Sequence, residues 1–175
     1  RAELAGHGVP ADGRHPLPSD EALADAARRW GIGVGQTVVV YDDSRSLPAS
    51  RAWWALRRAG VADVRVLDGG LAAWTAAGGP VEPGEVVVEP GDVVLGRPGS
   101  DDILDTDQVE LWTGVLLDAR APERFRGETE PLDPIAGHIP GARNLPIAEV
   151  LTADGRFRSP DEILAAFEAA GAGEE

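Results

Sequence analysis

Along the chain, segments in which apolar residues recur every three or four positions alternate with short continuous runs of apolar residues. Apolar residues recur every three or four positions from Asp20 to Trp30, which predicts an amphipathic helix with Ser19 as N-cap and Gly31 as its end. A β-branched run from Gln36 to Tyr41 predicts a buried strand. The same patterns predict further helices over Ser50–Ala59, Leu71–Ala77, Asp105–Leu111 and Asp161–Ala170, and further strands over Val64–Leu67 and Gly114–Asp118.

This alternation of strands and helices predicts an α/β fold with a parallel sheet. The Pro-rich segment Pro80–Ser100 interrupts it and is expected to be an extended linker that includes at most one edge strand. Arg120–Pro146 is expected to be mostly loop. Most of the five Trp residues are expected in the core, because large aromatic side chains usually fill interiors.

Charge and composition exclude several classes of function. The 175 residues carry 30 acidic and 16 basic side chains, a net charge of −14. A balance this acidic argues against binding to nucleic acid or to an anionic membrane surface, since both need a basic footprint. No apolar run has the length of a membrane-spanning helix and no signal peptide is evident, so the cytoplasm is the expected location.

Two residue types are missing from the sequence. Without Cys there are no disulfides, no thiolate metal sites and no thiol nucleophile within these residues. Without Met, Arg1 is not a translation start, so we expect that the sequence is part of a longer product.

An internal repeat suggests how the chain is organised. Ala11-Asp12-Gly13-Arg14 recurs as Ala153-Asp154-Gly155-Arg156, and Asp20-Glu21-Ala22-Leu23 recurs as Asp161-Glu162-Ile163-Leu164 at nearly the same offset. The first copy continues into a strand, whereas the second ends soon after its helix. We therefore expect the back part of one domain over residues 1–79, a linker over 80–102, and the front part of a second domain over 103–175.

The segment Leu117–Gly127, at the end of the predicted strand, contains three arginines and two acids. Ligands bind at the carboxyl ends of strands in open α/β sheets, and the planar guanidinium group of Arg suits oxyanions. Arg120 and Arg124 are therefore candidates for an anion site, and a surface salt-bridge cluster is the alternative. His138, in a turn rich in Gly and Pro, is interpreted as a structural hydrogen bonder rather than a general base.

The motifs taken together resemble the tandem-domain rhodanese family. The segments that resemble the front of its catalytic domain are Leu117–Arg120, Glu123–Gly127 and the signature-like run Gly137–Asn144 (Gly-His-Ile-Pro-Gly-Ala-Arg-Asn). The segments that resemble the back of its noncatalytic first domain are Val38–Asp42, Ser50–Trp54 and Val64–Trp74.

The resemblance implies a rhodanese-like parallel sheet with flanking helices and a thiosulfate sulfurtransferase activity. In that family a cysteine takes the outer sulfur of an anionic donor as a persulfide and passes it to cyanide or another thiophilic acceptor. No cofactor and no metal are implied. The cysteine is expected beyond Glu175, so these residues alone are expected to be inactive.

Particular residues match the family's site. Arg124 matches the position that binds the anionic donor, and Arg120 lines the same pocket; we hypothesise that Asp118 holds one of these arginines by a carboxylate–guanidinium pair. By the repeat, Asp42 stands where the catalytic domain has its cysteine, and with Asp43 it is interpreted as part of a solvated loop.

Other functions stay open. The mercaptopyruvate branch of the family carries a further Arg, whereas the corresponding segment Glu130–Pro134 has none and its nearest matching position is Asp133; this favours thiosulfate. A noncatalytic rhodanese-like binding or regulatory module is the second hypothesis, and a rhodanese-related phosphatase is the third. Because two incomplete sheets would leave open edges, the missing parts of the same protein or a second copy of the chain are expected as partners, unless the two copies complement each other.

Overall fold

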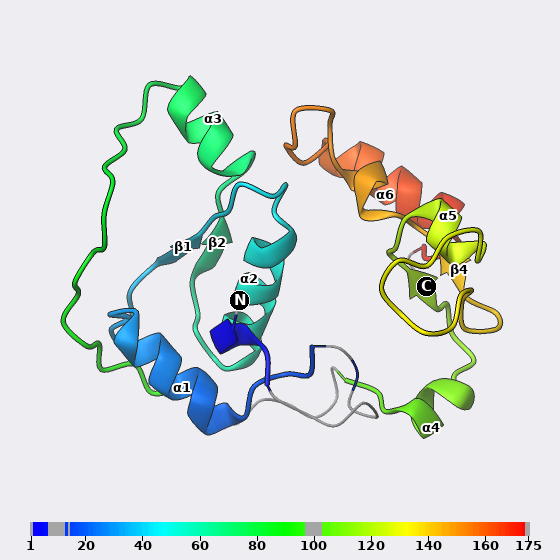
Figure 1. The fold of residues 1–175 in the computed structure, drawn as a ribbon, viewed down its shortest axis with the longest axis horizontal. Helices are drawn as coiled ribbons and strands as arrows, with labels where there is room; N and C mark the ends of the chain where they lie inside the picture. The colour runs from blue at the N-terminus through cyan, green and yellow to red at the C-terminus, as the bar shows by residue number, and fades with distance from the viewer. Residues whose placement is uncertain (1, 7–12, 14, 97–102, 174–175) are drawn as a thin grey trace. The chain divides into compact units, whose positions relative to one another are not determined.

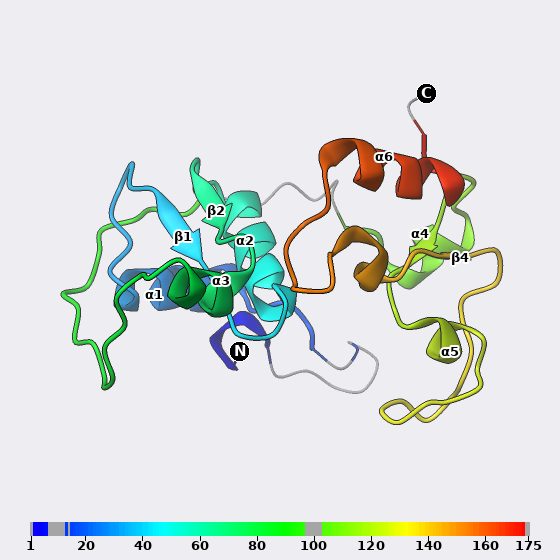
Figure 2. The same cartoon turned by 90° about the horizontal axis from the view of Figure 1, so that it is seen from above.

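The computed structural model describes residues 2–6, 13, 15–96 and 103–173 (Figures 1 and 2). The chain divides into two compact units, Arg1–Asp102 (unit 1) and Ile103–Glu175 (unit 2). The predicted separation of residues 1–79 from a linker over 80–102 is not tested by this division and stays a prediction.

Unit 1 is built around a parallel β–α–β arrangement. Its elements are the 3-10 helix η1 (Ala2–Leu4), α1 (Asp20–Arg29), β1 (Val38–Val40), α2 (Leu47–Arg58), β2 (Val64–Val66) and α3 (Gly70–Ala76). Strands β1 and β2 pair in parallel with Val38 opposite Val64, and α2 forms the crossover between them, as parallel pairing requires. Figure 1 shows α2 beside the two strands.

The core of unit 1 lies between α1, α2 and the sheet. Helix α1 begins as predicted at Ser19, whose hydroxyl accepts a hydrogen bond from the Ala22 N–H at 3.2 Å. Helix α2 begins earlier than predicted, at Leu47, since Pro48 is tolerated in the first helical turn. The buried residues of this core are Leu23, Ala27, Ile32, Ala55, Leu56, Ala59, Val61, Val64 and Val93.

Part of the Pro-rich segment packs on unit 1. After α3 the chain returns to α1 without forming a helix or a strand over residues 80–96 (Figure 1). The N–H groups of Gly91, Val93 and Gly96 donate to carbonyl oxygens of Arg28, Ile32 and Ala59 at 2.8, 3.1 and 2.9 Å. The segment therefore adds Val93 to the core instead of the edge strand for which we allowed; positions 97–100 lie outside the described residues.

Unit 2 contains a second pair of parallel strands. Its elements are α4 (Thr106–Glu110), β3 (Leu117–Asp118), α5 (Pro122–Phe125), β4 (Arg143–Asn144), the 3-10 helix η3 (Ile147–Val150) and α6 (Pro160–Ala169). Leu117 pairs with Arg143 and Asp118 with Asn144. Between the strands lies the predicted long loop, interrupted by α5. Leu145 and Leu151 are buried.

Several apolar residues predicted to be buried are exposed. Val39 and Tyr41 of the first predicted strand, and Trp74 and Trp112, are solvent-exposed, whereas the other three Trp residues are half-buried against the core of unit 1. The predictions of a buried strand and of mostly interior Trp were therefore wrong in this respect. In unit 1, Val39, Tyr41 and Trp74 line an open hollow together with Leu67, Leu71 and part of the segment after α3, so these side chains are not closed off from solvent.

Helices α1 and α6 share their cap geometry. The hydroxyl of Ser159 accepts from the Glu162 N–H at 3.3 Å, as that of Ser19 does in α1. Both helices are followed by a glycine with positive φ, Gly31 at 77° and Gly171 at 82°. These parallels agree with the predicted repeat, which stays a prediction; Ala11, Asp12 and Arg14 of its first copy lie outside the described residues.

Neither sheet is completed by the other part of the chain within the described ranges. Strand β1 pairs with β2, and β3 with β4, so each sheet draws both of its strands from one unit. Complementation of the two copies stays a prediction. The helices in the described parts are all too short or too polar to cross a membrane.

Candidate functional site

The two candidate arginines lie just beyond the carboxyl end of β3. Asp118 is the last residue of the strand, and its carboxylate accepts the Arg120 backbone N–H at 2.9 Å, which closes a tight turn. Helix α5 then starts at Pro122, a residue suited to a first helical turn, and carries Arg124 on its single turn. The predicted site residues of unit 2 are thus close together.

Asp118 holds Arg120, as hypothesised. The guanidinium Nε lies 3.0 Å from both carboxylate oxygens, and an Nη donates to Oδ2 at 2.6 Å. The same Nη donates to the Gly137 carbonyl at 2.6 Å, which ties the β3 end to the Gly-His-Ile-Pro turn. The side-chain hydrogen bonds from Arg120 lower the pKa of Asp118, and those to Asp118 raise the pKa of Arg120.

Arg124 is bound by two acids that lie further along the loop. Its Nη donates to Glu130 Oε1 at 2.7 Å and to Asp133 Oδ2 at 3.0 Å, and its Nε reaches Glu130 Oε2 at 3.2 Å. The side chain of Glu130 is only 5% exposed and also lies 3.5 Å from an Nη of Arg120. The hydrogen bonds from Arg124 lower the pKa of Glu130.

We call Asp118, Arg120, Arg124, Glu130 and Asp133 the arginine cluster. It is an ion-paired network, as the salt-bridge alternative predicted, and its role as an anion site stays a prediction. The Arg120 and Arg124 side chains are 30% and 19% exposed. Two guanidinium groups face three carboxylates, so an external anion competes with these carboxylates for the arginines.

Glu130 is the member of the cluster that sequence reasoning missed. It was noted only as part of a segment without Arg, yet it bridges both arginines. Its position could have suggested this role, because Glu130 is an acid in the loop between two motifs of the same predicted site. Arg126, by contrast, is on the surface and pairs with Glu128 at 2.6 Å.

His138 has the structural role that we predicted. Its Nδ1 lies 2.6 Å from the Phe125 carbonyl oxygen, and its ring stacks on the Phe125 ring with centroids 3.7 Å apart. A carbonyl oxygen only accepts hydrogen bonds, so Nδ1 carries the proton. His138 thus fixes the end of α5 against the turn that also binds Arg120.

Asp42 occupies a ring of backbone N–H groups in unit 1. Its Oδ1 accepts from Ser44 and Ser46 at 2.8 and 2.9 Å, and its Oδ2 accepts from Ala49 at 2.8 Å. Arg45 and Ser46 adopt the left-handed region, with φ of 59° and 63°, just before α2 begins. The interpretation of Asp42 as a solvated loop residue was therefore wrong, because its carboxylate organises the loop; the exposed Asp43 accepts from the Ser44 hydroxyl.

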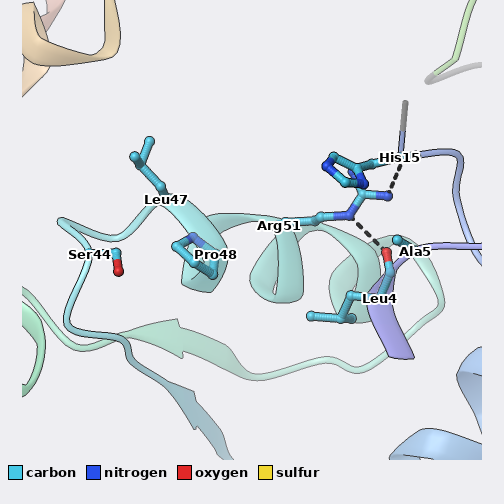
Figure 3. Close-up of a pocket in the computed structure, with 7 residues that line it drawn as sticks. All are labelled: Leu4, Ala5, His15, Ser44, Leu47, Pro48 and Arg51. Carbon is cyan, nitrogen blue, oxygen red and sulfur yellow. Dashed lines mark hydrogen bonds between the residues drawn. The ribbon is translucent and has the colours of Figure 1, made fainter. Parts of the chain in front are cut away.

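A hollow of about 450 Å³ lies beside this loop, as Figure 3 shows. Among the described residues that line it is Arg51, whose guanidinium donates to the carbonyls of Leu4, His15 and Pro16 at 2.8, 2.8 and 3.1 Å. These contacts fix the N-terminal segment on α2 and occupy the Nε and one Nη of Arg51. Over the described ranges, no three His, Cys, Asp or Glu side chains group as a metal site would need.

Known proteins resemble this chain in sequence and in fold. The rhodanese-like domain model matches residues 9–77. The chain is 48% identical over 159 residues to the putative thiosulfate sulfurtransferase SseB of Mycobacterium tuberculosis, covering 89% of this chain and 56% of SseB. It is 46% identical over 162 residues to a probable 3-mercaptopyruvate sulfurtransferase of Pseudomonas aeruginosa, covering 90% and 57%.

The solved structures agree on the fold. The structure of SseA from Escherichia coli, described as a 3-mercaptopyruvate sulfotransferase with the rhodanese fold, matches with a TM-score of 0.83 and 34% identity. The match covers 96% of this chain and 63% of SseA. The α/β fold is thus rhodanese-like, and the chain spans little more than half the length of the curated relatives it matches.

Proposed function

Because this chain is a rhodanese-fold relative of the sulfurtransferases, we propose that it forms the donor-binding part of an enzyme that moves sulfane sulfur through a cysteine persulfide. The observation that carries the proposal is the arginine cluster, where Arg120 and Arg124 lie side by side beyond the carboxyl end of β3. Their partly exposed guanidinium groups suit the oxyanion of a sulfur donor.

The nucleophile of this reaction comes from outside the 175 residues, since they contain no Cys. In the proposed reaction a cysteine thiolate attacks the outer sulfur of thiosulfate, the sulfur–sulfur bond of the donor breaks, and sulfite leaves with the bonding electron pair. The resulting persulfide passes its outer sulfur to a thiophile, which restores the thiolate. Arg124 and Arg120 bind the sulfonate oxygens during the attack.

Thiosulfate is the donor that we propose, and 3-mercaptopyruvate is the second candidate. The absence of an Arg in Glu130–Pro134 supports thiosulfate, as does the name of the M. tuberculosis relative. The name of the P. aeruginosa relative and the description of E. coli SseA favour 3-mercaptopyruvate, which offers a carboxylate to the same arginines.

Replacing Arg124 tests the donor site. In the polypeptide that carries these residues together with the nucleophilic cysteine, Arg124→Ala is expected to raise the KM for thiosulfate by about tenfold, the equivalent of one lost charged hydrogen bond. Arg126→Ala is the matched control, because Arg126 is an exposed arginine of the same segment that pairs with Glu128. An unchanged KM in Arg124→Ala would remove Arg124 from the donor site.

A noncatalytic rhodanese-like module is the other function to be tested, since these residues hold no Cys. The intact mass of the purified natural protein separates the two. A mass well above 18.3 kDa, with persulfide formed from thiosulfate and no phosphatase turnover, is expected for the sulfurtransferase. A mass equal to 18.3 kDa would instead favour the module.

A further inference from the structure

Glu130 is the carboxylate of the arginine cluster that both arginines share. Its Oε1 accepts from Nη2 of Arg124 at 2.7 Å and its Oε2 from Nε of Arg124 at 3.2 Å, a two-point contact along one edge of the guanidinium group. Oε2 also lies 3.5 Å from Nη1 of Arg120. The place of this one carboxylate therefore bears on both candidate donor-binding groups.

The main chain of its own loop holds Glu130. The side chain is 5% exposed, and Oε1 accepts the backbone N–H groups of Leu132 and Asp133 at 3.0 and 3.1 Å. Backbone donors have no rotamers, so they fix the carboxylate on which the two flexible arginine side chains are held.

The contact with Glu130 also selects which edge of Arg124 is open to a ligand. Nε and Nη2 donate to the acids of the loop, whereas Nη1 has no hydrogen-bond partner among the residues that the structure describes. Nη1 is therefore the group of Arg124 that a donor can reach while Glu130 keeps the opposite edge in place.

We propose that Glu130 is a positioning residue, which holds the guanidinium groups of Arg124 and Arg120 where they meet the sulfur donor. It acts through the arginines and does not itself touch the donor. This inference rests on the proposed function, because it assumes that donors bind at Arg124. A guanidinium that is already held loses less conformational freedom when a donor binds, so positioning strengthens binding.

The charge of Glu130 acts in the opposite direction. It partly neutralises the arginines and by itself would weaken the binding of an anionic donor. Loss of Glu130 therefore weakens donor binding if positioning dominates and strengthens it if charge dominates, so the sign of the change separates the two roles.

Two substitutions at Glu130 test the role. Glu130→Gln offers only one oxygen to a guanidinium edge that donates twice, and Glu130→Asp keeps the charge but is one methylene group shorter. Glu128→Gln is the matched control, because Glu128 is an exposed acid of the same segment that pairs with Arg126. Far-UV circular dichroism verifies that the variants are folded.

Steady-state kinetics are measured in the polypeptide that carries these residues together with the nucleophilic cysteine. We expect both Glu130 variants to raise the KM for thiosulfate about fivefold, and Glu128→Gln to leave it unchanged. In the Arg124→Ala background, Glu130→Gln is expected to change KM by less than about twofold, because its effect passes through the missing arginine. A merely structural loss would lower the amount of active enzyme, and so the apparent kcat, without moving KM.

A lower or unchanged KM in either Glu130 variant, or an equal rise in the Arg124→Ala background, would overturn the positioning role. The donor site itself stands in those cases as long as Arg124→Ala alone raises KM. An unchanged KM in Arg124→Ala would instead overturn the donor site and this inference with it.

Discussion

The loop after β1 and the loop after β3 begin with the same kind of residue, but the carboxylates of these two residues have different partners. Each starts with an aspartate at the carboxyl end of a parallel strand, Asp42 in unit 1 and Asp118 in unit 2. The carboxylate of Asp42 is bound by three backbone N–H groups of its own loop, whereas that of Asp118 binds the movable guanidinium of Arg120.

We call the ring of N–H groups around Asp42 the closed site, because its anion is part of the chain. The arginine cluster can instead exchange one of its carboxylates for an external anion, according to the proposed function. Backbone N–H groups are fixed by the fold, and the Asp42 carboxylate already accepts those of its loop. An external anion therefore cannot easily replace it. Guanidinium groups sit on flexible side chains, and their carboxylate partners in unit 2 include the exposed Asp133. The position beyond a strand end therefore gives a structural role in unit 1 and a proposed binding role in unit 2.

We expect the largest effect from a substitution that removes the carboxylate of Asp42. Asp42→Ala leaves three backbone N–H groups of the loop without their acceptor and removes what holds Arg45 and Ser46 in the left-handed region. We expect unit 1 to lose about 3 kcal/mol of unfolding free energy, as for the loss of charged hydrogen bonds. Urea unfolding followed by Trp fluorescence measures it, since Trp53 and Trp54 lie on α2.

Asp43→Ala is the control for that loss. Asp43 is exposed and accepts from the Ser44 hydroxyl, so its removal is expected to change the unfolding free energy by less than about 0.5 kcal/mol. Equal losses in the two variants would mean that the ring of N–H groups contributes no special stability.

A smaller effect, on the reactivity of a thiol, is expected when the carboxylate of Asp42 is replaced by the side chain of cysteine. Asp42→Cys places a thiol where the carboxylate accepts three N–H groups, and such donors stabilise a thiolate. At neutral pH we expect Asp42→Cys to react with iodoacetamide about tenfold faster than Asp43→Cys, which lies at the exposed neighbouring position. If the cysteine at position 42 reacts more slowly, the ring does not stabilise an anion.

The smallest effect concerns the acid dependence of the arginine cluster. Arg124 lowers the pKa of Glu130 in the folded chain, so Glu130 stabilises unit 2 fully above its ordinary pKa of 4.5 and loses that contribution as the pH falls through the lowered value. Glu130→Gln is therefore expected to be less stable than the parent at neutral pH, with a gap that closes below pH 4.5. Urea midpoints measured across this range test it, and a constant gap would contradict the pairing.

Local features of the sequence predicted much of the fold. Ser19 as a cap, Gly31 as a stop and the pairing of Asp118 with one of the two nearby arginines all depend on residues a few positions apart, where local chain geometry largely decides the contact. Glu130 was missed because its bridge to Arg120 and Arg124 depends on how a loop folds back. The exposure of Trp74 was also missed, because burial depends on how many strands and helices cover a sheet, which periodicity does not reveal.

In the proposed function the arginines of unit 2, and not Arg51 beside the loop of Asp42, bind the anionic donor. Titrating thiosulfate into the isotope-labelled 175-residue chain, with the Nε–Hε signals of individual arginines followed by NMR, tests this directly. We predict saturable shifts for Arg124 and Arg120 and none for Arg51, whose Nε donates to the Leu4 carbonyl. Saturable shifts of Arg51 with unchanged signals from Arg124 and Arg120 would contradict the claim.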